Sequence, residues 1–137
     1  MEVLIEHLGA VQFEIRARQH LIASDQPAEN GGFDEGMTPP ELMLASLGSC
    51  AAFYAAAYLR KHELAEAGTK VRVTAEKRLQ DGPPRLDDFR IFVDVAAGLD
   101  PKHLEGIDRA VHQCLIHNTL LHPPTIAIEI HSSALAV

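Results

Sequence analysis

Residues 38–59 read Thr-Pro-Pro-Glu-Leu-Met-Leu-Ala-Ser-Leu-Gly-Ser-Cys-Ala-Ala-Phe-Tyr-Ala-Ala-Ala-Tyr-Leu, and this stretch decides the fold. Thr38 can cap a helix, Pro39 suits its first position, and Glu41 completes a capping box. Residues 42–59 carry no charge, so we predict a helix that is buried on nearly every side. The run is just long enough to cross a membrane. Half of it is Ala, Gly or Ser, however, and strands flank it on both sides, which favours a soluble domain.

Short stretches of alternating polar and apolar residues surround this helix and predict strands. Before it we expect strands at 3–5, 11–16 and 19–24, followed by a loop at 25–37. After it come strands around 71–74 and 89–95, joined by a turn at 80–84. A second helix is expected to start at Asp100 and to carry Cys114 on its apolar stripe, and a last strand to contain Ile126, Ile128 and Ile130. This order predicts an α+β fold with a mainly antiparallel sheet, in one domain spanning residues 1–137.

The composition excludes several classes of function. The chain has 137 residues and a formal charge of −7, which disfavours binding to nucleic acid or to an anionic membrane. Its two cysteines are too few for a disulfide scaffold. The first residues show neither a basic segment nor a long apolar one, so we expect no signal peptide and a cytoplasmic protein.

The first helix also predicts a partner. One small sheet covers one side of such an apolar helix and the second helix covers another, so that part of the apolar surface of the first helix remains uncovered. We therefore expect a homodimer.

Cys50 and Cys114 are the candidate reactive groups, since they fall in equivalent helical settings and are the only cysteines. The alternative is that both are small buried apolar side chains. Cys50 would be reactive only with a lowered pKa, and because it lies far from the start of its helix it would need a nearby cation. Arg16 and Arg18 are the candidates, and Glu41 could orient either one.

Four late histidines offer another reading. With Cys114, they form a pattern that resembles a set of metal ligands, but the spacing matches no established zinc site. The predicted site therefore contains no metal and no cofactor. The histidines are His112, His117, His122 and His131.

Several sequence blocks together resemble the OsmC/Ohr superfamily, the osmotically inducible and organic hydroperoxide resistance proteins. The resemblance spans nearly the whole chain and is nearest to the general OsmC-like branch. Its strongest part is the pair of cysteines in their two contexts. The blocks are Arg18-Gln19-His20, Asp25-Gln26-Pro27, Gly31-Gly32, Thr38 to Leu42, Leu47 to Cys50, Cys114 with His117 to Leu120, and Pro123-Pro124.

The resemblance implies an intertwined homodimer with two central helices that bear the cysteines. It also implies roles: Cys50 as the peroxidatic nucleophile, Cys114 as the resolving cysteine, Arg18 as the cation beside the thiolate, and Glu41 as the partner of that arginine. One difference concerns Glu41, which lies nine positions before Cys50, whereas the peroxidase branches have a glutamate ten positions before.

Three functions follow as expectations. The first is a thiol-dependent peroxidase that reduces organic hydroperoxides and is itself reduced by a dithiol. The second is a dimeric binding module for a small apolar ligand, with cysteines that respond to redox conditions. The third is a structural or metal-binding dimer.

Overall fold

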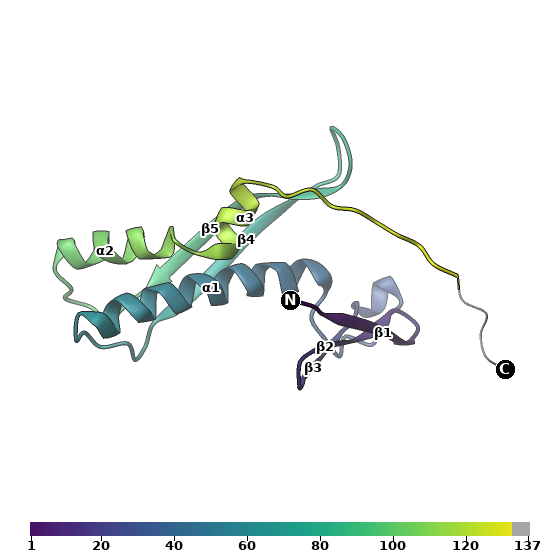
Figure 1. Ribbon diagram of the computed structural model, residues 1–137, viewed down its shortest axis with the longest axis horizontal. Coiled ribbons are helices and arrows are strands. Elements are labelled where there is room, and N and C mark those ends of the chain that lie inside the picture. The colour runs from purple at the N-terminus through teal and green to yellow at the C-terminus, as the bar shows by residue number, and fades with distance from the viewer. Residues whose placement is uncertain (133–137) are drawn as a thin grey trace.

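The computed structural model describes residues 1–132 and shows an α+β chain (Figure 1). The elements and their bounds, in chain order, are β1 (Leu4–Gly9), β2 (Gln12–Ala17), β3 (His20–Ser24), the short 3-10 helix η1 (Ala28–Asn30), α1 (Pro39–Lys61), β4 (Lys70–Arg78), β5 (Arg85–Asp94), α2 (Pro101–Val111) and α3 (Leu115–Leu121).

The strands form two separate antiparallel sheets, where the sequence suggested one. The sheet β1–β2–β3 lies beyond the N-terminal end of α1, and β4–β5 is a long hairpin that runs along α1 (Figure 1). Within the described residues, the edges of the two sheets share no backbone hydrogen bonds, because the loop 25–37 and α1 separate them.

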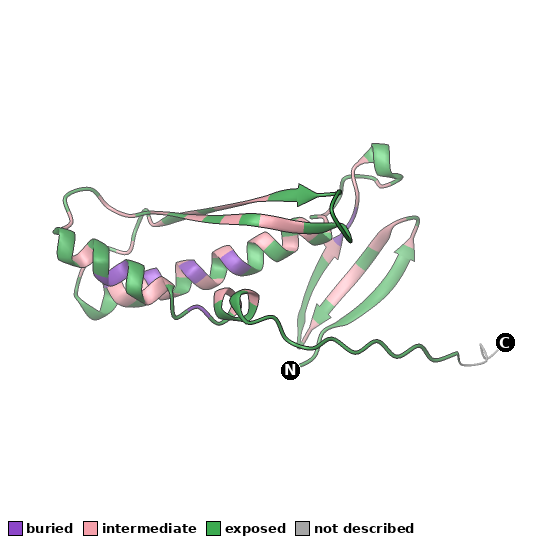
Figure 2. Ribbon diagram, turned by 90° about the horizontal axis from the view of Figure 1, so that it is seen from above, coloured by how far each residue is buried: buried purple, intermediate pink, exposed green. Residues whose placement is uncertain are grey.

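The core forms where α1 meets α2 and the hairpin. Residues Leu47, Ala51, Ala55 and Leu59 recur every four positions of α1, and all are buried. Their spacing places them on one helix face, as the 3.6-residue period requires. Ala55 and Leu59 pack with Ile107 of α2, and Val93 and Val95 border this cluster. Figure 2 shows buried residues at intervals along α1, while most of the chain remains exposed or half-buried.

The prediction of one helix through Cys114 is wrong. The chain turns at His112–Gln113, so α2 ends at Val111 and a separate helix, α3, begins at Leu115. Cys114 is the N-cap of α3, with an extended ψ of 123° and a side chain that accepts from the backbone N–H of His117. A residue that caps a helix with its side chain must leave helical geometry, which explains the interruption.

The predicted last strand is also absent from the described residues. Positions 123–132 run as an extended arm away from α3 (Figure 1). Ile126, Ile128 and Ile130 alternate as expected, yet they are 84%, 82% and 92% exposed. A strand needs a neighbour for its backbone groups, and no other described segment of the chain lies alongside.

Candidate functional site

The two cysteines meet between α1 and the start of α3. Cys50 lies in the middle of α1 and is half-buried, and Cys114 caps α3 and is 0% exposed. Both are free thiols, and each influences the pKa of the other. The structure therefore brings together the two residues that the sequence singled out as reactive.

The pKa of Cys50 lies below that of an ordinary thiol. Burial of the thiol is the largest single influence and raises the pKa. Three hydrogen-bond donors outweigh it: the thiol of Cys114, and the backbone N–H groups of Ile116 and Leu115. Donors aimed at a sulfur stabilise its anion, so Cys50 is the thiol that ionises first.

The pKa of Cys114 is raised instead. Burial is again the largest influence, and the hydrogen bond to Cys50 adds to it because Cys114 must keep its proton to donate. The backbone N–H of His117, 3.4 Å from the Cys114 sulfur, acts in the opposite direction but does not reverse the shift. The two thiols are thus unequal, since the pKa of Cys50 is lowered and that of Cys114 is raised.

The two candidate arginines lie on the three-stranded sheet. Arg16 on β2 donates to Glu14 at 2.7 Å, and Arg18 occupies the exposed two-residue turn between β2 and β3. Neither contributes to the pKa of Cys50 in the described chain, 1–132.

Glu41 lies in the first turn of α1, as the capping box predicted. It accepts from the backbone N–H and the hydroxyl of Thr38, and these two bonds, the backbone one foremost, lower the pKa of its carboxyl group. Lys77 of β4 adds a weaker attraction. Glu41 therefore stays ionised, which an arginine partner would require.

The late histidines do not gather into one cluster. His112 bonds to the backbone oxygen of Asp108 at 2.8 Å, His122 bonds to that of Asn118 at 3.1 Å, and His131 pairs with Glu129 at 3.5 Å on the arm. Only the rings of His112 and His117 meet, at 5.4 Å between centroids. Within residues 1–132, no group of three or more His, Cys, Asp or Glu side chains is arranged to share a metal ion.

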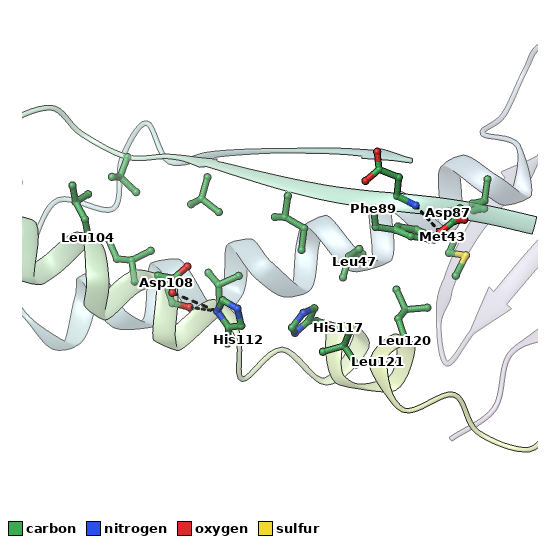
Figure 3. Close-up of a pocket in the computed structure, with 17 residues that line it drawn as sticks. Met43, Leu47, Asp87, Phe89, Leu104, Asp108, His112, His117, Leu120 and Leu121 are labelled. Carbon is green, nitrogen blue, oxygen red and sulfur yellow. Dashed lines mark hydrogen bonds and ion pairs between the residues drawn. The ribbon is translucent and has the colours of Figure 1, made fainter. Parts of the chain in front are cut away.

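A cavity of about 860 Å³ lies between β5, α1 and the helices α2 and α3 (Figure 3), and neither cysteine is among its lining residues. Its wall is mostly apolar, with Leu47 of α1, Phe89 of β5, Ile107 of α2 and Leu120 of α3 among its residues. His117 also lines it, and the Nδ1 atom of this residue is buried with no hydrogen-bond partner in the described part of the chain. The size and lining suit an apolar occupant.

The sequence matches one known protein family. The family model described as OsmC-like protein matches residues 32–129. The chain belongs to the OsmC-like family. The matched region runs from the loop before α1 to the arm after α3, so it includes Cys50 and Cys114 of this OsmC-like protein.

Solved structures share the fold of this OsmC-like protein at low sequence identity. A protein from Psychrobacter arcticus 273-4, provisionally named for osmotic stress induction and detoxification response, is 24% identical with a TM-score of 0.76, over 85% of each chain. An OsmC-like protein from Mycoplasma pneumoniae is 18% identical with a TM-score of 0.71, over 90% of this chain and 89% of that one.

A third solved structure is named as an organic hydroperoxide resistance protein OsmC, a predicted redox protein, from Legionella pneumophila. It is 15% identical to this OsmC-like protein with a TM-score of 0.59, over 88% of this chain and 89% of that one. No curated protein matches the sequence. At these identities the structures establish the fold alone.

The donors from Leu115 and Ile116 are the part of the site that sequence reasoning missed. They are backbone N–H groups, which every residue except proline carries, so no residue type marks them. They reach Cys50 only because the chain interrupts the helix at Cys114 and starts α3 beside α1. The break itself has no strong signal, since the apolar stripe continues through it.

Proposed function

We propose that this OsmC-like protein is a thiol-dependent peroxidase that reduces organic hydroperoxides, with Cys50 as nucleophile and Cys114 as resolving cysteine. The observation that carries the proposal is the pairing of two free thiols with opposite pKa shifts, lowered for Cys50 and raised for Cys114. A two-cysteine peroxidase needs this asymmetry, because its first thiol must be ionised to attack the peroxide and its second reacts only after the sulfenic acid has formed. The name of the Legionella pneumophila relative adds support.

The proposed cycle has three balanced steps. The Cys50 thiolate attacks the terminal oxygen of the hydroperoxide, the O–O bond breaks, and the alkoxide takes a proton to leave as an alcohol. Cys50 is then a sulfenic acid, which condenses with the Cys114 thiol to a disulfide and releases water. An external dithiol reduces that disulfide and is itself oxidised. The cycle uses no metal or other cofactor.

We further propose that the protein works as a homodimer. The chain exposes 10682 Å², whereas a compact monomer of this mass exposes about 7,000 Å². A surplus of this size is what a large obligate interface covers. Phe53 on α1 is 67% exposed, and three isoleucines of the arm are above 80%, so the uncovered surface is strongly apolar.

The composition of α1 favours a dimer interface, rather than a membrane, as the explanation for its exposed apolar surface. By length and by a mean hydropathy of 1.6, α1 could cross a bilayer, and only 22% of its most apolar window is buried within the chain. The helix is rich in Ala, Gly and Ser, however, and these small residues let a second helix approach closely. We therefore assign its free faces to a second copy and the protein to the cytoplasm.

The roles of Arg18 and Glu41 are part of the proposal. In the dimer, Arg18 of one copy would lie beside Cys50 of the other, and Glu41 would orient it. The exposed position of Arg18 in the β2–β3 turn leaves it free to do so. The permanently charged guanidinium would then add to the backbone donors that already favour the thiolate.

A second candidate function is a dimeric binding module for a small apolar ligand. The mostly apolar cavity of about 860 Å³ between β5, α1, α2 and α3 favours it. In that case the cysteines would change redox state without rapid turnover.

One experiment separates the two candidates. The reduction of cumene hydroperoxide is followed with excess dihydrolipoamide for the wild type, Cys50→Ser and Cys114→Ser. The peroxidase predicts steady turnover by the wild type, none by Cys50→Ser, and a single turnover by Cys114→Ser when no thiol is supplied. A wild type that leaves the peroxide unreduced would exclude the peroxidase and leave the binding module.

A further inference from the structure

The wall of the cavity between β5, α1, α2 and α3 contains no lysine or arginine from the described residues, 1–132. Three aspartates and two histidines are its ionisable side chains, and its other lining residues are apolar. The aspartate side chains are 40% to 72% exposed, so they lie at the entrance and leave the interior apolar. The five ionisable residues are Asp87, Asp88, Asp108, His112 and His117.

Each aspartate at the entrance already has a basic partner. An anionic ligand would have to compete with these carboxylates for the arginines, and inside the cavity it would meet no arginine or lysine of the described chain. Burial of a charge without a partner is very costly, so a carboxylate does not suit the interior. The pairs, at 2.9 to 4.0 Å, are Asp87 with Arg78 and Arg85, Asp88 with Arg90, and Asp108 with His112.

His117 is the polar side chain that an occupant of the cavity would meet. Figure 3 shows its ring among the lining side chains, next to that of His112. Its Nδ1 atom is buried and has no hydrogen-bond partner within residues 1–132. A buried N–H without an acceptor is costly, so the proton of the neutral ring belongs on Nε2, and an imidazolium, which is protonated on both nitrogens, is disfavoured. His117 is therefore an uncharged ring with one N–H to donate.

We propose that this cavity binds an uncharged apolar molecule with one hydrogen-bond acceptor, such as the carbonyl oxygen of an ester, and discriminates against carboxylates. Nε2–H of His117 donates to the acceptor, and the apolar wall holds the rest of the molecule. The inference rests on the apolar-ligand binding proposed above and defines the chemistry of that ligand. It does not depend on peroxidase turnover, since neither cysteine lines the cavity.

The occupant is a small molecule rather than the second copy of the chain. The exposed apolar residues that support the dimer, Phe53 and the isoleucines of the arm, are not part of the cavity wall. The wall instead comes from four elements of a single chain, β5, α1, α2 and α3. A volume of about 860 Å³ falls in the range of small-molecule sites.

A single tryptophan can report binding at this cavity. The chain has no tryptophan, and Leu121 lines the cavity while its side chain is largely exposed, so Leu121→Trp introduces a local fluorophore. Its emission shifts to the blue when an apolar ligand excludes water around it. The probes are methyl octanoate and octanoate, which have the same chain and differ in charge. Calorimetry on the wild type measures both affinities without the reporter.

Two variants, each made with and without the reporter, test the role of His117. His117→Phe keeps an aromatic ring of similar size but removes the N–H donor. His122→Phe is the matched control, because His122 lies at the end of the same helix, is exposed and does not line the cavity. Circular dichroism checks that each variant is folded.

We expect methyl octanoate to bind about tenfold or more tightly than octanoate at pH 8, where octanoate is ionised. His117→Phe should weaken the binding of methyl octanoate roughly three- to tenfold, the effect of losing one hydrogen bond. His122→Phe should bind both probes as the wild type does.

Three results would overturn the inference: equal affinities for the ester and the carboxylate, ester binding that His117→Phe leaves unchanged, or no binding of either probe by the wild type. Equal affinities would leave the apolar binding module standing and remove only its selectivity. If the ester binds as expected but the wild type does not reduce peroxides, the inference stands and the proposed peroxidase function fails. If peroxides are reduced but the ester does not bind, the inference alone fails.

Discussion

The carboxylate of Glu41 accepts two hydrogen bonds from Thr38, one from the backbone N–H and one from the hydroxyl, each 2.8 Å long. Both end on Oε2, and Oε1 makes no hydrogen bond within the described residues. Glu41 thus stabilises the start of α1 with one oxygen while the other stays free for an arginine. The two roles proposed for this residue are compatible in geometry.

The first prediction concerns this cap. Glu41→Ala removes both hydrogen bonds, whereas Thr38→Ala removes only the one from the hydroxyl, because the backbone N–H at position 38 remains. Each variant should lower the urea midpoint, and the double variant should lose less than the sum of the two single losses. Because the bonds lower the pKa of Glu41, their contribution is present above the unfolded pKa of about 4.3 and is lost as the pH falls through the folded value. Losses that simply add would show that Thr38 and Glu41 act separately.

The second prediction concerns the loop before α1. Asp25 is 1% exposed and accepts the backbone N–H groups of Gln26, Phe33 and Glu35 at 2.8, 3.1 and 3.1 Å. Burial raises its pKa, but these bonds outweigh burial and the net pKa is lowered. The stabilisation is therefore present above the unfolded pKa of about 3.9 and disappears below the folded value.

Asp25→Asn should accordingly destabilise the protein at pH 7 and destabilise it less at pH 2, as measured by urea unfolding at both pH values. The exposed Asp34 in the same loop provides the control, since Asp34→Asn should have a small effect at either pH. A destabilisation by Asp25→Asn that is equal at both pH values would mean that shape, not charge, makes Asp25 important.

The third prediction concerns the contact between α1 and α2. A Cβ atom built on Gly106 would overlap the hydroxyl and ring of Tyr58, which bonds to Nδ1 of His103 at 3.2 Å. Gly106→Ala should displace Tyr58 and cost about 1–3 kcal/mol by overpacking. In a Tyr58→Ala background the same change should stabilise, since Ala is better than Gly in a helix by about 1 kcal/mol. Chemical denaturation of the four proteins tests this reversal of sign, and equal effects in both backgrounds would contradict it.

The fourth prediction concerns the homodimer. Phe53→Glu places a charge on the exposed apolar face of α1 and should yield monomers or insoluble protein, as seen by sedimentation velocity. Ala67→Glu, in the exposed loop after α1, should leave the dimer intact. A wild-type chain that sediments as a folded monomer at micromolar concentration would refute the dimer.

The fifth prediction concerns the cation. If Arg18 reaches Cys50 of a second copy, Arg18→Met should slow the alkylation of Cys50 below pH 8. Arg16→Met serves as the comparison, because Arg16 already pairs with Glu14. Equal rates for both variants and the wild type would show that the hydrogen bonds from Cys114, Leu115 and Ile116 suffice.

The start of α1 and the positions of most strands could be predicted because their causes are local. A capping box and a proline define the beginning of a helix wherever it packs, and alternation of polar and apolar side chains follows from the two-residue period of a strand. For the same reason Cys50 and Glu41 fall where the sequence placed them, on α1 and in its first turn.

Only the tertiary structure decided the rest, because those features depend on groups that the sequence does not mark. The break at Cys114, and with it the approach of the Leu115 and Ile116 N–H groups to Cys50, arises from backbone conformation. The arm at residues 123–132 is a second feature that the sequence could not predict. Its polar and apolar residues alternate as in a strand, but a strand forms only where a neighbouring segment supplies backbone hydrogen-bond partners. Sequence alone thus singled out the two cysteines, while the fold brought the backbone N–H groups of Leu115 and Ile116 to Cys50, where they lower the pKa of its thiol.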